Sequence, residues 1–253
     1  MLFFICLVLT IRSHSYHQSK FFNSSKALFG SILSTQTNVS DYFNLRQENR
    51  VLVQENERLR LQLFNSETTT PQASNLTNQY EVIHARIVKN MYSSPRNYIT
   101  INRGESDGIT QDMGVITPEG ILGIVENTSQ GYATIQSVLN TKSNINAKIK
   151  NTDYFGSLQW DAKDYDVVQL VDIPRSATVT VGDTITTGAM SSIFPEGIPI
   201  GVIKQYDLNQ NQSSYNIQVD LINDMANLRN VYVIKNKDRQ EILELQERTQ
   251  NVE

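Results

Sequence analysis

The sequence predicts a mainly β protein whose β region is preceded by a helical segment. Between residues 42 and 63, leucine and asparagine recur on a heptad period, which is typical of a coiled coil. From Tyr80 onward, apolar and polar residues alternate on a period of two, as in half-buried strands. Gly, Pro, Asn and Asp separate these short runs, and none of them has a convincing helical period. We therefore expect an all-β sandwich or a pair of barrels after the helical segment.

The chain starts with an apolar segment that is too short to cross a membrane. Residues Met1–Ile11 are nearly all apolar, whereas a membrane-spanning helix needs about 20 such residues. A basic stretch before the run and a small-residue cleavage site after it would indicate a signal peptide, and neither is present. We expect residues 1–35 to form a membrane anchor, truncated at its start, and a juxtamembrane helix. Arg12, Lys20 and Lys26 follow the apolar run and, taken alone, would place the rest of the chain in the cytoplasm.

Residues 36–65 are predicted to form a parallel, dimeric coiled coil. The a and d positions, which would make the dimer interface, are Tyr42, Leu45, Asn49, Leu52, Asn56, Leu59 and Leu63. Leucine at d gives the helix an apolar stripe that needs a partner. Asparagine at a lowers stability but selects two helices in one register. The alternative is a single amphipathic helix that packs on its own domain.

Charged residues beside this stripe favour the same register in two of three places. Pairing of g with e′ positions would bring Asp41 to Arg46 and Glu55 to Arg60, whereas Glu48 would meet Val53. The coiled coil is therefore expected to gain two interhelical ion pairs.

A polar linker is expected over residues 66–79, and thirteen short strands are expected after it. These are Tyr80–Val88, Asn97–Arg103, Gly114–Thr117, Ile121–Val125, Thr134–Val138, Ile145–Ile149, Tyr154–Trp160, Val167–Val171, Thr178–Val181, Asp183–Thr187, Ile198–Ile203, Tyr215–Leu221 and Leu228–Ile234. The chain closes with a charged tail, residues 236–253, which is expected to be a frayed helix or disordered.

A tetrapeptide, Pro-Glu-Gly-Ile, occurs at Pro118 and again at Pro195. Proline and glycine at these spacings suit a type I turn, so we predict two hairpin turns in related barrels. The alternative is chance recurrence of common turn residues. The second copy belongs to a rigid, apolar segment that could be either a barrel corner or an edge that docks a partner. Its docking candidates are Phe194, Pro195, Gly197, Ile198, Pro199 and Gly201.

The chain offers few residues for catalysis or metal binding. Its histidines are His14, His17 and His84, and the only cysteine is Cys6. A serine triad could be built only with His84, which is expected to face solvent, and no third zinc ligand lies near His14 and His17. The net charge of −4 and the pI of about 5.5 argue against a nucleic-acid surface. We expect no catalytic residue, no metal and no cofactor.

The order of the segments and several motifs resemble the rod shape-determining protein MreC family. The motifs that carry the resemblance are Asn97–Gly104, Asp107–Ile109, Gly114–Gly123, Val181–Thr184 and Phe194–Gly201. The departure lies at the N-terminus, since that family has a full transmembrane helix preceded by a short basic stub. The resemblance implies that such a stub would supply the cytoplasmic positive charge, which reconciles Arg12, Lys20 and Lys26 with a β domain on the other side of the membrane.

The resemblance implies two small β-barrels, one inserted in the other. We expect the first at residues 80–112 plus 204–235 and the inserted one at residues 113–203. It also implies a non-catalytic scaffold of the elongation machinery, with a single span in the bacterial inner membrane and the β domain in the periplasm.

The partners implied are a second copy of the chain, with a possible higher assembly, and a class B penicillin-binding transpeptidase with its glycosyltransferase. A multi-span membrane protein and, indirectly, the actin-like cytoskeleton would complete the complex. Two alternatives remain. An export-pump adaptor would need a second helix that returns after Leu63, and no such heptad run follows. An envelope hydrolase would need the catalytic groups that the chain lacks.

Overall fold

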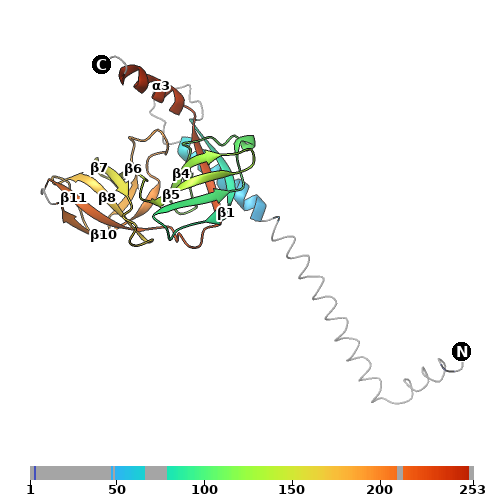
Figure 1. Cartoon of the computed structure of the whole chain (residues 1–253), viewed down its shortest axis with the longest axis horizontal. Helices are drawn as coiled ribbons and strands as arrows, with labels where there is room; N and C mark the ends of the chain where they lie inside the picture. The colour runs from blue at the N-terminus through green and yellow to red at the C-terminus, as the bar shows by residue number, and fades with distance from the viewer. Residues whose placement is uncertain (1–2, 4–46, 48, 66–78, 210–212, 251–253) are drawn as a thin grey trace. The chain divides into compact units, whose positions relative to one another are not determined.

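The computed structural model describes residues 3, 47, 49–65, 79–209 and 213–250, and in them the β region forms two closed, six-stranded barrels. The first barrel has the strand order β1 (Tyr80–Asn90), β12 (Asn230–Asn236), β3 (Gly114–Ile116), β4 (Ile121–Thr128), β5 (Ala133–Asn140) and β2 (Arg96–Ile101). The second has the order β10 (Pro199–Leu208), β11 (Ser214–Leu221), β8 (Val167–Pro174), β7 (Phe155–Gln159), β6 (Ile145–Ile149) and β9 (Thr184–Thr187). The two groups of strands lie side by side (Figure 1). The predicted mainly β fold with two barrels is confirmed.

The boundaries predicted for the two barrels are wrong. Strands β3, β4 and β5 belong to the first barrel, although they follow the predicted limit at residue 113. Strands β10 and β11 belong to the second barrel, although they extend past the predicted limit at residue 203. The reason is that alternation shows which face of a strand is buried but not which strand pairs with it. Strand β12 pairs with β3, which places Tyr232 opposite Ile116. No pattern in the local sequence predicts this pairing.

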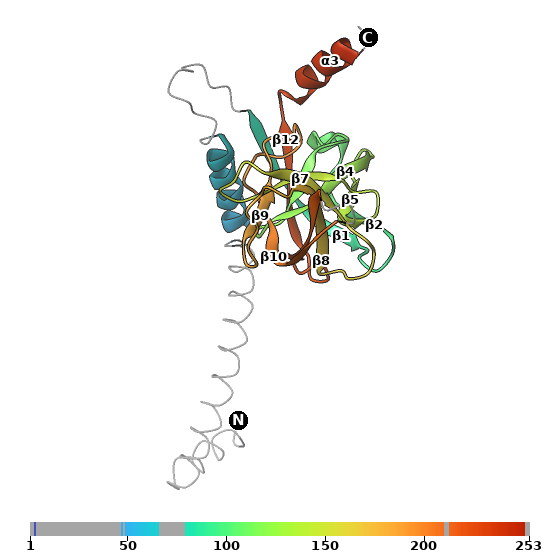
Figure 2. The ribbon, with the colours of Figure 1, turned by 90° about the vertical axis from the view of Figure 1, so that its left-hand side faces the viewer.

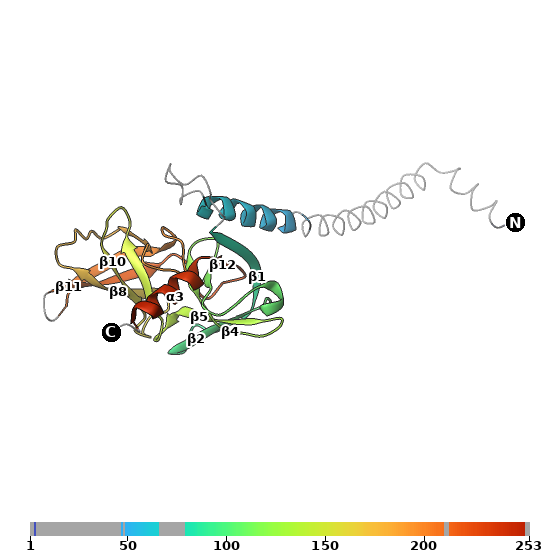
Figure 3. The same ribbon diagram turned by 90° about the horizontal axis from the view of Figure 1, so that it is seen from above.

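Insertion of the second barrel into the first follows from the strand order. All strands of the second barrel lie between β5 and β12 in the sequence. Strand β12 then returns to close the first barrel between β1 and β3. Figure 3 shows β1 next to β12, with β8, β10 and β11 grouped on the other side.

One of the thirteen predicted strands is absent from the described residues. Thr178–Val181 is a connection whose backbone groups are used locally. The Asp183 carboxylate accepts a hydrogen bond from the Thr180 N–H at 3.1 Å, and the Asp183 N–H donates to the Thr180 carbonyl at 3.1 Å. Gly182 completes the turn with a positive φ of 96°. These bonds compete with a strand ladder, because each backbone group can serve only one of them.

Both Pro-Glu-Gly-Ile segments form turns between strands that pair with each other. The first connects β3 to β4, where the Thr117 N–H donates to the Gly120 carbonyl at 2.8 Å. The second ends the longer connection between β9 and β10, where the Thr187 hydroxyl accepts from the Ile198 N–H at 2.9 Å. The predicted hairpin turn is confirmed for the first segment, whereas the second is only the last part of a longer connection between paired strands.

The two barrels are joined by buried contacts. Phe194, from the β9–β10 connection of the second barrel, is 1% exposed and packs on Gly114 of β3. The fit is close, because a Cβ on Gly114 would lie 2.6 Å from Cε1 of Phe194. Nearby, the Asn236 side-chain amide donates to the Ser192 carbonyl at 3.0 Å. These contacts fix the β9–β10 connection against the first barrel.

The C-terminal tail contains a helix, α3 (Arg239–Gln250), which continues the chain from β12 (Figure 2). Arg239 forms an ion pair with Asp112 at 3.2 Å and so ties the first turn of α3 to the first barrel. Leu245, farther along, is largely exposed.

Several predictions concern residues outside the described part of the chain. These are the anchor at residues 1–35 except Phe3, the start of the coiled coil, and the linker at residues 66–79 except Gln79. Among the described residues, no helix combines the length and apolar character that a membrane span requires.

Removing the Phe194 ring should destabilise the protein strongly, because a cavity would remain between the barrels. We expect Phe194→Ala to lower the free energy of unfolding by about 3–5 kcal/mol. The matched control is Tyr132→Ala, which removes an exposed ring of the first barrel and should change stability by about 0.5 kcal/mol or less. Urea unfolding of both variants measures this. Equal losses in the two variants would contradict the assigned packing.

Candidate functional site

The helix at residues 49–65 carries the predicted dimer interface, and its last turns have two different faces. On one face, Leu59 is 50% exposed and Leu63 is 54% exposed, and Leu52 is also exposed. On the other face, Leu61 is partly buried against the core and Phe64 is buried. The first face is the predicted a and d stripe. The second face is not part of the heptad pattern.

The buried face holds the helix end on the first barrel through four residues, Arg60, Leu61, Phe64 and Asn65, which we call the helix clamp. One Nη of Arg60 donates to the Pro118 carbonyl at 2.8 Å, and the guanidinium carbon lies 4.8 Å from the centre of the Tyr232 ring. This geometry is that of a cation–π contact.

Two aromatic and amide contacts complete the clamp at the start of β1. The Phe64 ring meets Tyr80 edge to face, with 6.4 Å between ring centres. The Asn65 side chain accepts from the Tyr80 N–H at 3.0 Å and donates to the Tyr80 carbonyl at 3.2 Å, as a neighbouring strand would.

The clamp covers the outer face of the β1–β12 strand pair. Val82 pairs with Ile234, and His84 pairs with Tyr232, so these four side chains share one face. The opposite face lines the barrel with Ala85 and the valines of β12. The signal was present in the sequence, since four consecutive apolar residues at 231–234 indicate a strand that is buried on both sides.

The prediction that His84 faces solvent is wrong. Its Nε2 lies 3.2 Å from the Asn230 side-chain oxygen, and its ring centre lies 5.7 Å from that of Tyr232. The residue is half-buried on the outer face of β1, beside Asn230 and Tyr232 of β12. Burial lowers the pKa of His84, the hydrogen bond to Asn230 opposes that shift, and Arg86 and Arg103 add to it.

The six docking candidates of residues 194–201 lie mostly inside the protein. Phe194, Pro195, Ile198 and Gly201 are buried, Pro199 is partly buried, and only Gly197 is exposed. At Gly201 the backbone approaches β11 so closely that a Cβ would lie 2.1 Å from the Asp220 carbonyl oxygen. The arrangement agrees with the barrel-corner alternative, so direct contact with a partner is open mainly to the turn at Gly197.

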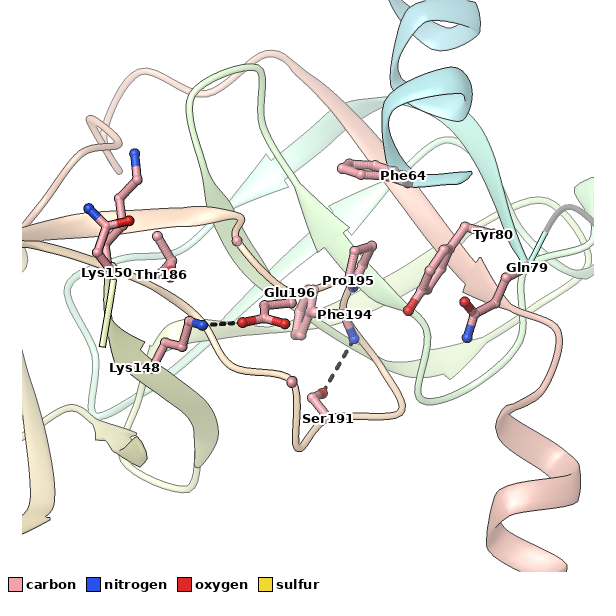
Figure 4. Close-up of a pocket in the computed structure, with 13 residues that line it drawn as sticks. Phe64, Gln79, Tyr80, Lys148, Lys150, Thr186, Ser191, Phe194, Pro195 and Glu196 are labelled. Carbon is pink, nitrogen blue, oxygen red and sulfur yellow. Dashed lines mark hydrogen bonds and ion pairs between the residues drawn. The ribbon is translucent and has the colours of Figure 1, made fainter. Parts of the chain in front are cut away.

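A pocket of about 490 Å³ lies beside this corner, between the helix clamp and the second barrel (Figure 4). Phe64 and Tyr80 line one end of it, and Lys148 and Lys150 line the other. In Figure 4, Glu196 points toward Lys148, with which it forms an ion pair. The pocket offers cationic and aromatic groups. Among the described residues, no three His, Cys, Asp or Glu side chains are grouped to hold a metal ion.

Two exposed apolar side chains lie near the end of β10, and we call them the β10 patch. They are Tyr206 and Leu208, each 38% exposed. They pair with Ile217 and Tyr215 of β11, and Tyr206 packs edge to face on Tyr215 with 5.5 Å between ring centres. Val202 is also exposed but faces the other way, because it pairs with Asp220 before the register shift between Ile203 and Gln205. The sequence prediction missed this patch because it ended the strand at Ile203, whereas β10 continues past that shift to Leu208.

The fold and these surfaces define a double-barrel protein with an N-terminal helix clamped to its first barrel. A family model described as "Rod shape-determining protein MreC, barrel core" matches residues 87–235. The chain therefore belongs to the MreC family.

The relatives have similar names and modest sequence identity. The cell shape-determining protein MreC of Listeria monocytogenes is 26% identical over 159 residues, which is 62% of this chain and 54% of the relative. That of Haemophilus influenzae is 25% identical over 210 residues, or 76% of this chain and 56% of the relative. This chain thus spans about half the length of these curated relatives.

Solved structures share the fold. A structure of MreC from Listeria monocytogenes has a TM-score of 0.59 and 25% identity, covering 78% of this chain and 92% of that one. A complex between penicillin-binding protein PBP2 and MreC from Helicobacter pylori has a TM-score of 0.50 and 13% identity, covering 62% of this chain and 99% of that one. The second likeness concerns the fold alone.

The half-buried His84 should make stability depend on pH. Its ordinary pKa of 6.5 applies to the unfolded chain, and the folded pKa is lower. As pH falls below 6.5, the unfolded state takes up the proton first, so the free energy of unfolding falls until pH passes the folded pKa. His84→Gln should lack this contribution, while His14 and His17 remain in both proteins.

Urea unfolding of the two proteins between about pH 7.5 and about pH 5 tests this dependence, since this range spans the titration of a histidine. The stability difference between wild type and His84→Gln should change in favour of the variant as pH falls. A difference that does not vary with pH would contradict the burial of His84 as the cause.

Proposed function

We propose that this chain is a non-catalytic scaffold that organises peptidoglycan synthases during the elongation of rod-shaped cells. The observation that carries the proposal is membership of the MreC family over most of the double barrel. The exposed a and d stripe on a helix that is clamped to the barrels supports it. The adaptor and hydrolase alternatives receive no support from the site, so the scaffold is the function we retain.

Dimerisation is the first part of the proposal. Leu59 and Leu63 expose about half of their surface on the helix face that the clamp leaves open. Burying a leucine side chain is worth about 1.5–3 kcal/mol, and a second copy offers the same stripe. The two helix alternatives raised by the sequence are therefore compatible, since one face can pack on its own domain while the other pairs with a second helix.

Anchoring is the second part. The apolar residues 1–11 would continue a single span of the bacterial inner membrane, and residues 66–79 would link the coiled coil to the barrels in the periplasm.

Docking of synthases is the third part. A class B penicillin-binding transpeptidase is the proposed direct partner, and the Helicobacter pylori complex of PBP2 with MreC supports this choice. Its glycosyltransferase, a multi-span membrane protein and the actin-like cytoskeleton would belong to the same complex. The surface we assign to docking is the β10 patch together with the exposed turn at Gly197, because clustered exposed apolar side chains mark interaction sites.

Serine at two d positions should abolish the dimer, because a polar residue there removes the apolar stripe. We expect Leu52→Ser with Leu59→Ser to be monomeric by analytical ultracentrifugation and to fail to restore rod shape in a deletion strain. Val51→Ser is the matched control, since Val51 is equally exposed but lies off the stripe. Full restoration of rod shape by a strictly monomeric double variant would refute the dimer in this function.

Changes in the β10 patch should weaken binding of the transpeptidase without affecting the dimer. We expect Tyr206→Ala with Leu208→Ser to raise the Kd about tenfold or more, since large apolar side chains dominate such interfaces. Tyr132→Ala removes an exposed ring from the first barrel and should leave the Kd unchanged. Titration of the purified partner by calorimetry gives both values. A double variant that binds like wild type would move the docking site elsewhere.

A further inference from the structure

We propose that Arg60 and Asn65 are positioning residues that hold the barrels at a fixed orientation to the dimer interface. This inference rests on the proposed dimer. The dimer stripe would bring two helices together. The helix clamp would set the orientation of each chain's two barrels relative to those helices.

Arg60 is held by the first barrel through two contacts of its guanidinium group. One Nη donates to the Pro118 carbonyl at 2.8 Å, and the guanidinium carbon lies 4.8 Å from the centre of the Tyr232 ring. Its Nε is buried without a protein acceptor. An arginine that swings away would lose both contacts at once.

Asn65 joins the helix end to the first strand. Its amide nitrogen donates to the Leu61 carbonyl at 2.8 Å and to the Tyr80 carbonyl at 3.2 Å, while its oxygen accepts from the Tyr80 N–H at 3.0 Å. Only a side chain with both a donor and an acceptor can make this set. Asn65 thus caps the last turn of the helix at the Leu61 carbonyl. It also bonds to the backbone of Tyr80 as a neighbouring strand would.

The clamp and the stripe can be occupied together. With 3.6 residues per turn, the centre of the clamp and the stripe of Asn56, Leu59 and Leu63 are separated by roughly 140° around the helix axis. Arg60 lies at the border, because it occupies the e position beside the stripe. Pairing of two helices would therefore leave each clamp closed, and each barrel would lie next to the helix pair.

Because Arg60 contacts the barrel, we no longer expect the ion pair between Glu55 and Arg60 that the heptad pattern predicts. The register pairs Glu55 of one helix with Arg60 of the other. An exposed interhelical ion pair contributes little, whereas the barrel already provides Arg60 with a carbonyl acceptor and an aromatic face. The dimer is thus expected to form without this ion pair.

The orientation is tested on the full chain by distance measurements between two protomers. Cys6→Ser removes the native thiol, and Lys163→Cys places a spin label on an exposed loop of the second barrel. Pulsed electron paramagnetic resonance should give a narrow distribution of the distance between the two labels in the Cys6→Ser, Lys163→Cys protein. Arg60→Ala with Asn65→Ala should make it roughly twofold broader, because the barrels would gain a hinge. Arg58→Ala, an exposed arginine of the same helix, is the control and should keep it narrow.

Two measurements separate this inference from the dimer itself. If the Arg60 and Asn65 variant remains dimeric by ultracentrifugation and its distribution stays narrow, the inference is overturned while the dimer stands. If the wild type is monomeric, the dimer fails, and hydrogen exchange of residues 56–65 decides the clamp. Exchange about tenfold faster in the variant supports the clamp, and unchanged exchange overturns it.

A double-mutant cycle on the Kd of the dimer tests whether Arg60 contacts its own barrel or Glu55 of the second helix. Glu55→Gln and Arg60→Gln are measured singly and together. We expect the two effects to multiply within about twofold, which means no coupling across the helix pair. Coupling of about fivefold or more would show that Arg60 pairs with Glu55 of the second helix and would overturn its assignment to the barrel.

Discussion

The outer face of the β1–β12 strand pair must be kept from water, and the helix clamp covers it at Tyr80 and Tyr232. Val82, Tyr232 and Ile234 are buried on that face, although the opposite face of the same strands already lines the barrel. A strand pair that is apolar on both sides cannot be satisfied by barrel closure alone. The helix end is therefore part of the fold of the first barrel, and its orientation follows from which of its side chains fill this face.

The same requirement for closed packing explains the corner at Phe194. The β9–β10 connection could have been a free loop, but its phenylalanine fills the space above Gly114, where β3 has no side chain. Phe194 of the second barrel thus fills the gap at Gly114 of the first barrel and holds the two barrels together. The apolar, proline-rich sequence of this segment is thus explained by burial in its own chain.

The sequence predicted features that depend on local period and missed those that depend on distant pairing. Alternation located nearly every strand, and the heptad stripe of Leu52, Leu59 and Leu63 is the face that the structure leaves exposed. Thr178–Val181 failed because Asp183 caps a turn there, which outweighs β-branched composition. The barrel limits failed because they depend on which strands pair, which alternation does not show. The burial of His84 was missed although the apolar run at residues 231–234 indicates that β12 is buried on both faces.

The helix clamp and the Phe194 corner cover part of the first barrel, so those parts of its surface are closed to partners. The helix clamp occupies the outer side of β1 and β12, and the corner at Phe194 occupies the side of β3. The second barrel has no corresponding helix among the described residues, and its β10 carries apolar side chains that remain accessible. The self-association and docking that we propose would therefore use different elements, the helix and β10. Arg60 and Asn65 hold the helix end on the first barrel, and Phe194 of the second barrel packs on Gly114 of the first. Residues 56–65 and β10 thus belong to one packed unit, which is the physical property that the proposed scaffold needs.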